Sequence, residues 1–393
     1  MLKLIGRKDK LFNRDISFFK DELKNQVSRS SFLILGGAGT IGKAVTKQIF
    51  KRNPIKLHVV DLSENNLVEL VRDLRSTYGY IKGDFQTFAL DIGSTEYDAF
   101  IQSDGKFDYV LNLSALKHVR SEKDKFTLMR MISVNILNTE KTIEQSIAKG
   151  VKKYFCVSTD KAANPVNMMG ASKRIMEMFL ISKSKKISVS SARFANVAFS
   201  DGSLLHGFNQ RIKNKQPIVA PNDIKRYFLT PEESGELCLM SCLLAENRDV
   251  YFPKLSENLN LITFSDIAIN YLKQKGYETF ICKSEEEARE NVEDLISKKK
   301  WPCLFNKSDT SGEKYFEEFY SKSEVIDLQV FHKIGVIKNK SNFDNNKLEK
   351  FKAAINLMLE RKNWTKSDIV NLFYDIVPNF KHIEKGKYLD SKM

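Results

Sequence analysis

Three glycines at three-residue spacing follow a short apolar run near the start of the chain. Phe32 to Leu35 is the run expected of a buried strand, and residues 43–50 have the spacing of an amphipathic helix. Between them, a first glycine permits a tight turn, a second lets a pyrophosphate approach the backbone, and a third lets helix and strand pack closely. The helix N-terminus adds free N–H groups and partial positive charge. The pattern therefore predicts a dinucleotide-phosphate site at Gly36, Gly39, Thr40, Ile41 and Gly42.

A carboxylate stands about twenty residues after these glycines, at the end of a second strand pattern over residues 56–61. In this position an acid can accept hydrogen bonds from both hydroxyls of a ribose, whereas it repels a 2′-phosphate. Asp61 therefore favours NAD over NADP as the cofactor. Glycine spacing alone is weak evidence, because a plain tight turn explains most such matches. The strand, helix and acid around it make the prediction more specific.

Strand and helix patterns alternate from residue 31 to about residue 190. Further strands are expected over residues 87–91, 107–114, 151–158 and 191–196. Such alternation predicts an α/β fold of the Rossmann type, a doubly wound parallel sheet with helices on both faces. Ligands then bind beyond the carboxyl ends of the strands. Asp91, Ile92, Ala115 and Thr159 fall there, and the first three join the predicted cofactor site.

The predicted sheet accounts for only part of the chain. Residues 1–30 contain an amphipathic helical pattern, which we expect to pack on the body of the protein or on a partner subunit. Residues 31–190 form the expected NAD-binding domain. The looser pattern of residues 191–338 predicts a smaller, mixed substrate-binding lobe interleaved with that domain. Residues 339–393 predict a C-terminal helical segment.

Composition limits the class of protein. The chain has 393 residues, a net charge of +14 and 42% hydrophobic residues, as expected of an ordinary soluble protein of two or three domains. No apolar run is long enough to cross a bilayer and no signal peptide is recognised, so we expect a cytoplasmic protein with reduced cysteines. The lysines are spread along the chain and the cysteines lack metal-like spacing. We therefore expect neither a nucleic-acid partner nor a metal site.

A second group of motifs resembles a known enzyme family. Ser158-Thr-Asp-Lys-Ala-Ala-Asn-Pro165, followed by Gly170-Ala-Ser-Lys173, resembles the extended short-chain dehydrogenase/reductase family. Within that family the chain is similar to the nucleotide-sugar 4,6-dehydratases that act on UDP-N-acetylglucosamine in bacterial surface glycan biosynthesis. Further family motifs occur in the expected order at residues 115–119, 193–197 and 226–230, with a weaker match at 312–314.

The resemblance implies a closed redox cycle on the sugar, with NAD as the hydride carrier. Oxidation at C4 acidifies the C5 proton, water is lost across C5 and C6, and hydride returns to C6. By resemblance, Asp160 is the acid at the C6 oxygen, Lys161 is the base at C5, and Thr159 hydrogen-bonds the C4 oxygen. Lys173 is implied to bind the nicotinamide ribose. Without the family context, a turn with an Asp160–Lys161 surface ion pair would be the simpler interpretation.

One position departs from the usual pattern of this family. Most short-chain dehydrogenases place a tyrosine four residues before the lysine, where tyrosinate takes the alcohol proton, but this chain has Met169 before Lys173. A methionine cannot transfer a proton. One branch of the dehydratases has Met-Gly-Ala-Thr-Lys in this place, and the chain resembles that branch. The base for the C4 hydroxyl must then be another group or a water, and Met169 is equally compatible with core packing.

The substrate contacts implied by the resemblance are cationic or polar. They are Lys117, His118, Lys161, Asn196 and Arg226. Lys117 and Arg226 are candidates for the diphosphate of UDP-N-acetylglucosamine, because cationic side chains suit phosphate oxygens. A long helix is expected over residues 128–150 and resembles helices that pair across a two-fold axis in this family. We therefore expect a homodimer or a larger even-numbered homo-oligomer.

Two other functions stay open at this point. A nucleotide-sugar epimerase on the same scaffold would need no acid at the C6 oxygen, so Asp160 is evidence against it. A catalytically inactive NAD-binding regulatory protein is the third interpretation, and Met169 is the feature that supports it.

Overall fold

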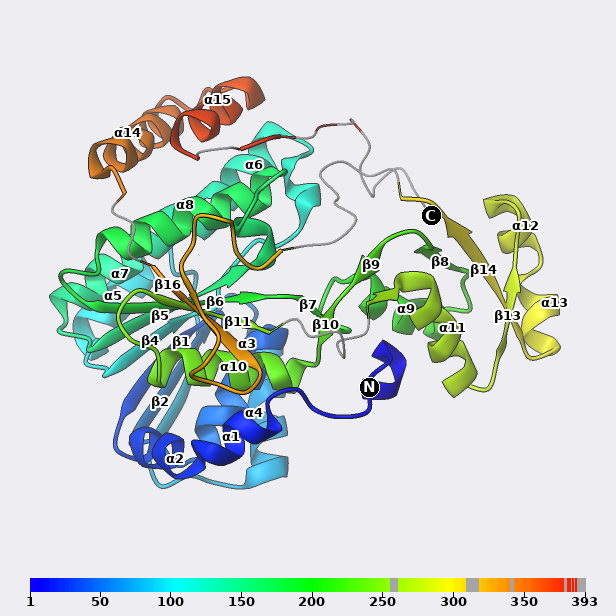
Figure 1. Cartoon of the computed structure of the whole chain (residues 1–393), viewed down its shortest axis with the longest axis horizontal. Helices are drawn as coiled ribbons and strands as arrows, with labels where there is room; N and C mark the ends of the chain where they lie inside the picture. The colour runs from blue at the N-terminus through cyan, green and yellow to red at the C-terminus, as the bar shows by residue number, and fades with distance from the viewer. Residues whose placement is uncertain are drawn as a thin grey trace.

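A nine-stranded sheet forms the centre of the protein, in the strand order β15-β16-β11-β6-β5-β4-β1-β2-β3 (Figure 1). The structure is a computed structural model that describes residues 1–254, 261–308, 318–339, 343–377, 380–382, 384 and 386, so the motif at residues 312–314 lies outside the described residues. Strands β1 to β6 and β11 run parallel, and β16 and β15 add an antiparallel edge. The order of β1 to β6 is that of a doubly wound Rossmann sheet, which confirms the predicted fold class.

Strands β1 to β6 lie within a few residues of those expected from the sequence, whereas β11, β15 and β16 were not predicted. From the β3 edge they are β3 (Asp84–Ala89), β2 (Lys56–Asp61), β1 (Ser31–Leu35), β4 (Tyr109–Asn112), β5 (Lys153–Thr159), β6 (Ser188–Phe194), β11 (Asp249–Pro253), β16 (Ile334–Lys338) and β15 (Ile326–Asp327). Strands β11, β15 and β16 come from the stretch that the sequence assigns to the lobe, so residues 191–338 contribute to both parts of the protein.

Helices cover both faces of the sheet because both sets of alternating strand side chains are apolar. One face packs against α1 (Asn13–Phe18), α2 (Lys20–Ser28), α3 (Thr40–Phe50), α4 (Glu64–Tyr78) and α10 (Pro231–Leu243). The other face packs against α5 (Thr95–Asp104), α7 (Asn138–Ala148) and α8 (Met168–Ser182). Within β1, Phe32 and Ile34 face the first set, whereas Leu33 and Leu35 face the second.

The single helix expected over residues 128–150 is divided in the structure. It begins as α6 (Lys125–Ile132), widens into a π-helical turn at Ser133–Leu137, and continues as α7. The C-terminal helices α14 (Asn345–Arg361) and α15 (Lys366–Ile376) pack on α6 and α8, with Phe351 and Phe373 buried there. The chain's own C-terminal helices therefore cover part of the surface for which pairing with a second copy is predicted.

A smaller lobe lies beside the carboxyl ends of the strands (Figure 1). Its parallel sheet contains β13 (Glu278–Ile281), β14 (Lys300–Asn306) and β8 (Ile218–Pro221). Its helices are α9 (Leu204–Lys213), α11 (Phe264–Gln274), α12 (Glu285–Glu290) and α13 (Val292–Ser297). Two small strand pairs connect it to the main sheet: β7 (Asn196–Val197) with β10 (Phe228–Leu229), and β9 (Lys225–Arg226) with β12 (Ile262–Thr263). Trp301 is the largest side chain of its apolar core.

Short helical turns complete the described chain. They are Leu2–Ile5, Val119–Glu122 and Asp160–Ala162. Within the described ranges, no helix combines the length and the apolar character needed to span a membrane.

Candidate functional site

The glycine turn after β1 requires glycine at Gly36 and Gly42. Gly36 has a φ of +72°, and a Cβ there would lie 2.6 Å from the backbone nitrogen of Ser114. A Cβ on Gly42 would lie 2.2 Å from the carbonyl oxygen of Gly36, whereas one on Gly39 would meet nothing closer than 3.9 Å. Gly36 and Gly42 therefore serve tight turning and close packing. The space at Gly39 lies open at the N-terminus of α3, where Thr40 and Ile41 form the first helical turn.

Two carboxylates predicted to bind the cofactor lie on neighbouring strand ends. Asp61 Oδ2 accepts a hydrogen bond from the Ala38 N–H of the glycine turn at 2.8 Å, so the acid and the turn are held together. Asp91 lies in the loop after β3, accepts the Gly93 N–H, and pairs with Arg130 at 3.0 Å. Burial would raise the pKa of Asp91, but these hydrogen bonds outweigh it and keep the pKa below its ordinary value.

The other predicted cofactor residues also lie at the edge of the sheet where the parallel strands have their carboxyl ends. Ile92 is buried in the loop after β3, and Ala115 is half-buried in the loop after β4. The hydroxyl of Thr40 donates to the carboxylate of Asp201 at 2.8 Å and accepts from the Asp201 N–H at 2.9 Å. This reciprocal contact ties the glycine turn to the loop before α9.

The predicted catalytic residues Thr159, Asp160 and Lys161 form one turn at the carboxyl end of β5. Asp160 is 4% exposed, and its Oδ1 accepts the Thr159 hydroxyl at 2.8 Å, the Lys161 N–H at 2.9 Å and the Lys161 ammonium at 3.1 Å. Its Oδ2 takes no hydrogen bond from the described part of the chain. One oxygen thus fixes the turn, and the other is free to face a ligand.

Lys173 and Met169 lie on the first turns of α8, beside this strand end. Lys173 is 4% exposed and donates to the Val157 carbonyl at 3.1 Å. Burial lowers the pKa of its ammonium group. Met169 is 5% exposed and belongs to the apolar cluster that α6, α14 and α15 share with α8. The structure therefore brings Lys173 close to β5, whereas the thioether of Met169 packs among apolar side chains.

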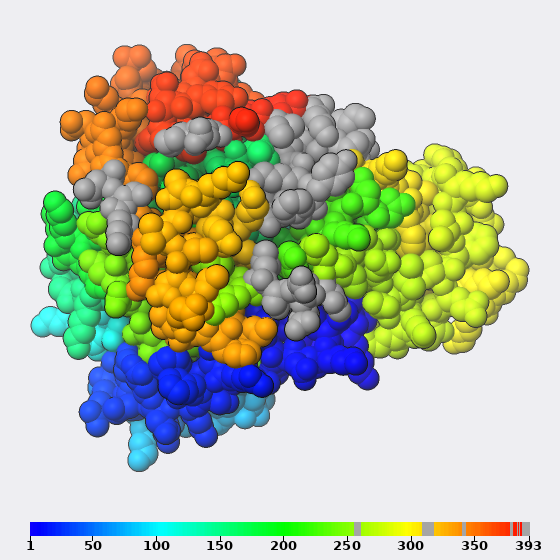
Figure 2. Space-filling model, viewed as in Figure 1, coloured from blue at the N-terminus to red at the C-terminus, as the bar shows by residue number. Residues whose placement is uncertain are grey.

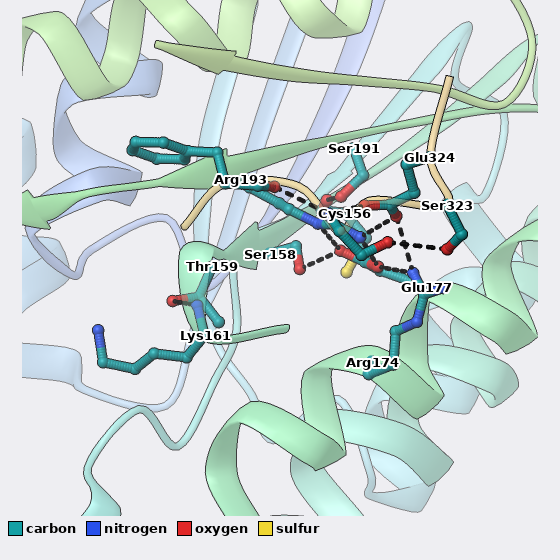
Figure 3. A network of polar contacts seen from close by, with 12 residues as sticks. Cys156, Ser158, Thr159, Lys161, Arg174, Glu177, Ser191, Arg193, Ser323 and Glu324 are labelled. Carbon is teal, nitrogen blue, oxygen red and sulfur yellow. Dashed lines mark hydrogen bonds and ion pairs between the residues drawn. The ribbon is translucent and has the colours of Figure 1, made fainter. Parts of the chain in front are cut away.

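A buried ionic network lies next to the predicted catalytic turn, as Figure 3 shows. All five N–H donors of Arg193 are used: two on Glu177, two on Glu324 and one on the Phe319 carbonyl, at 2.7 to 2.9 Å. Glu177 also accepts the Ser158 hydroxyl at 2.6 Å. Since Ser158 directly precedes the predicted catalytic turn, the network links α8, β6 and the segment before β15 to that turn.

The charges of this network compensate one another. Burial alone would raise the pKa of Glu177, but the charge and hydrogen bonds of Arg193 lower it to about 2. Arg174 contributes as well, through contacts of 3.0 Å to Glu177 and 3.2 Å to Glu324. In Figure 3 the side chain of Lys161 extends away from this network. The network can therefore position the turn, and Lys161 stays outside it.

Apart from Lys161 in the turn after β5, the predicted substrate residues divide between two places. Lys117 and His118 are exposed in the loop after β4, and Lys117 lies 3.3 Å from the hydroxyl of Ser200. Asn196 is half-buried on β7, and Arg226 is buried on β9, with its guanidinium donating to the Lys225 carbonyl at 3.0 Å. Asn196 and Arg226 thus belong to the small strand pairs between the sheet and the lobe.

Sequence reasoning did not find the acidic members of the network. Arg193 was noted as part of a motif, but Glu177 follows Lys173 by one helical turn and carries no motif of its own. Glu324 lies 131 residues after Arg193 in a stretch without a periodic pattern. Asp201, the partner of Thr40, was also missed. A buried helix position occupied by an acid was the one available signal, and it applies to Glu177 alone.

Comparison with known proteins gives the chain a family context. The model of a family described as "polysaccharide biosynthesis protein" matches residues 32–339. An uncharacterized membrane protein of Methanocaldococcus jannaschii is 30% identical over 343 residues, which cover 84% of this chain and 91% of that protein. The capsular polysaccharide biosynthesis protein CapD of Staphylococcus aureus is 27% identical over 85% of this chain, which spans about half (52%) of CapD. A UDP-glucose 4-epimerase of Rickettsia bellii is 28% identical, with 77% and 91% covered.

Solved structures share the fold. The X-ray structure of Pen from Bacillus thuringiensis superposes with a TM-score of 0.64 at 23% identity, covering 86% of this chain and 99% of that one. DesIV from Streptomyces venezuelae, a dTDP-glucose 4,6-dehydratase with NAD and TYD bound, superposes with a TM-score of 0.55 at 14% identity, covering 73% and 87%. At these identities the likeness establishes the Rossmann-like fold alone.

Proposed function

The chain belongs to the polysaccharide biosynthesis protein family, and on that premise we propose that it is a NAD-dependent enzyme that dehydrates UDP-N-acetylglucosamine to a UDP-4-keto-6-deoxy-N-acetylhexosamine. The broader part of this proposal is that the protein modifies a nucleotide sugar, and the specific part is that the reaction is 4,6-dehydration. The specific proposal depends on the contact between the buried carboxylate of Asp160 and the partly buried ammonium of Lys161 at the end of β5. The product would serve surface glycan biosynthesis.

NAD fits the residues around the glycine turn. A dinucleotide phosphate can approach the open side of Gly39 at the N-terminus of α3, and the carboxylate of Asp61, held beside the same turn, can accept hydrogen bonds from ribose hydroxyls. Lys173 is buried beside the end of β5, where it can donate to a nicotinamide ribose. When bound, NAD supplies the hydride acceptor for C4 and the hydride donor for C6.

Transfer of one proton between Lys161 and Asp160 can turn this ion pair into the base and the acid that the reaction needs. Moving a proton across the 3.1 Å contact, from the Lys161 ammonium to the Asp160 carboxylate, gives a neutral amine and a carboxylic acid without exchange with solvent. The amine then removes the C5 proton, and the acid protonates the departing C6 hydroxyl, so water leaves and the pair is again an ion pair. Thr159 can hydrogen-bond the C4 oxygen from the same turn.

Epimerisation at C4 is the second candidate, because the Rickettsia bellii protein named UDP-glucose 4-epimerase matches 77% of this chain. Epimerisation at C4 leaves the C6 hydroxyl in place, so it needs no acid at the C6 oxygen such as the one proposed for Asp160. The two reactions differ in mass balance, which makes them simple to distinguish.

The test is incubation of the pure protein with UDP-N-acetylglucosamine and NAD, followed by mass spectrometry. Loss of one water supports dehydration, and an isomer of unchanged mass would point to the epimerase. The absence of any product, with NAD still bound, would leave an inactive NAD-binding protein. The homo-oligomer predicted from the sequence is checked on the same sample by light scattering, where a monomer would contradict it.

Variants of the catalytic turn connect the activity to its residues. Asp160→Asn should slow water loss by about a hundred- to ten-thousand-fold, the usual contribution of general acid catalysis. Lys161→Ala should permit oxidation at C4 and then stall, so the absorbance of reduced cofactor should accumulate. Lys152→Ala is the matched control, because the side chain of Lys152 is exposed and pairs with Asp108 just before the same strand. Full activity of the Asp160→Asn, Lys161→Ala double variant would contradict the mechanism.

A further inference from the structure

A lysine-rich groove lies over the outer face of α3, away from the predicted catalytic turn. It has a volume of about 1380 Å³ and is bounded by the first residues of the chain, α3, the start of α10 and the end of α11. Figure 1 shows the N-terminal end of the chain beside α11, and Figure 2 shows it lying against the lobe. Neither Asp160 nor Lys161 lines the groove. The predicted catalytic turn therefore does not explain why lysines gather in this groove.

The charge of this groove is only partly compensated. Of the three acidic residues that line it, Glu232 pairs with Lys10 at 2.6 Å, Asp73 pairs with Lys47 at 2.5 Å, and Asp201 is hydrogen-bonded to the hydroxyl of Thr40. Five further lysines line the groove without an ion-pair partner among the described residues. They are Lys3, Lys8, Lys43, Lys51 and Lys273.

The spacing of the lysines on α3 places them in one row. Lys43, Lys47 and Lys51 are four residues apart, so they lie on one face of the helix. Burial and the neighbouring Arg52 lower the pKa of Lys51, and the opposing charges of Glu236 and Glu232 do not fully offset them. Like charges held together in a concavity repel one another and attract an anion.

The opposite wall of the groove is fixed by a buried ion pair. Arg7 pairs with Glu233 of α10 and donates to the Phe228 carbonyl at 3.0 Å. Glu233 also accepts the Leu11 N–H at 2.7 Å and forms a capping box with Thr230. These contacts hold residues 7–11 against α10, which keeps Lys8 and Lys10 at the edge of the groove. The site is therefore part of the folded body.

The size and lining of the groove indicate the class of ligand. Its volume is larger than one phosphate needs, and apolar residues such as Leu2, Phe199 and Pro231 share the wall with the lysines. A concave wall with both features suits a small molecule that has an organic part and several negative charges. We propose that this groove binds a small organic molecule carrying two or more phosphate groups, at a site separate from the predicted catalytic turn.

Titration calorimetry with inorganic tripolyphosphate as the probe tests the site, with NAD present in excess. The wild-type protein should bind the probe, and the variant Lys43→Gln, Lys51→Gln, Lys273→Gln should bind it about tenfold or more weakly, because three charge-assisted contacts are lost. The matched control is Lys298→Gln, Lys347→Gln, Lys350→Gln, which removes the same charge from exposed positions elsewhere. The control should bind like the wild type. Circular dichroism checks that each variant is folded, and Lys273→Glu alone serves if the triple variant is not.

Three results would overturn the proposal. Equal weakening in the groove variant and the control would show that net charge, not a site, attracts the probe. Loss of probe binding when NAD is added to the wild type would place the anion at the glycine turn. Binding to vesicles that contain phosphatidylserine, without binding to tripolyphosphate, would identify the groove as a membrane-facing surface instead.

Discussion

Two buried glutamates have opposite environments. Glu177, near the predicted catalytic turn, is 1% exposed and accepts hydrogen bonds from Arg193, Arg174 and Ser158. Glu236 of α10 is 5% exposed, and its Oε2 has no hydrogen-bond partner within the described ranges. The pKa of Glu177 is lowered to about 2, whereas burial and then the charge of Glu232 raise the pKa of Glu236 to about 7.

The difference shows that partners, rather than depth, decide whether a buried carboxyl group keeps its charge. Burial raises the pKa of both groups, and only Glu177 has cations close enough to reverse the effect. Compensated charges are suited to holding a structure in one geometry, as the Arg193 network does beside the predicted catalytic turn. Uncompensated charges are suited to responding to pH or to a ligand, as in the lysine-rich groove near Glu236.

The largest effect is expected when the compensated network is broken. Glu177→Gln should lower the free energy of unfolding by about 3–5 kcal/mol, because Arg193 would be left as a buried charge with too few partners. Glu69→Gln is the control, since its pair with Arg72 is exposed and should contribute less than about 1 kcal/mol. Denaturant unfolding at pH 7 measures both. A loss no greater than the control's would contradict the view that Glu177 holds this region.

A smaller effect of opposite sign is expected at Glu236. A raised folded-state pKa means that stability is fully present below the ordinary value of 4.5 and is lost as pH rises toward about 7. The wild type should therefore lose about 2–3 kcal/mol of unfolding free energy over that interval. Glu236→Gln keeps the neutral form at every pH, so it should remove this loss and be the more stable protein at pH 8.

The measurement is denaturant unfolding of both proteins from pH 4.5 to 8. The groups that act on Glu236 include Glu232, Glu233, Lys10 and Lys51, and all of these are kept in the variant. Glu69→Gln is again the control, because its side chain is 63% exposed and Glu69 is not among the groups that shift the pKa of Glu236. The same pH slope in the wild type and in Glu236→Gln would show that another group causes the change.

Local patterns predicted the glycine turn and Asp61, because strand periodicity and turn chemistry act within a few residues. The roles expected of Thr159, Asp160 and Lys161 came from the resemblance of that stretch to a family motif. The compensation of Arg193 depends on Glu324, which the sheet brings across 131 residues. Isolated charged residues in a sequence are normally interpreted as solvated. The sequence pattern alone therefore predicts neither the Arg193 network nor the lysine-rich groove.

The smallest effect is expected at Met169, which stands where most short-chain dehydrogenases have tyrosine. It is 5% exposed and packs in an apolar cluster, next to a turn that is held by hydrogen bonds rather than by shape. Met169→Leu conserves volume, so it should cost less than about 1.5 kcal/mol of stability. If polar partners fix the turn and the thioether transfers no proton, kcat for water loss should stay within about threefold of the wild type.

The neighbouring Met168→Leu is the matched control, because Met168 is fully buried in the same cluster. Both variants should show the same small changes in unfolding free energy and in kcat. A kcat that falls a hundredfold in Met169→Leu but not in Met168→Leu, at equal stability, would mean that the sulfur atom itself has a role in the reaction. The base for the C4 hydroxyl would then be a water molecule positioned by that sulfur atom.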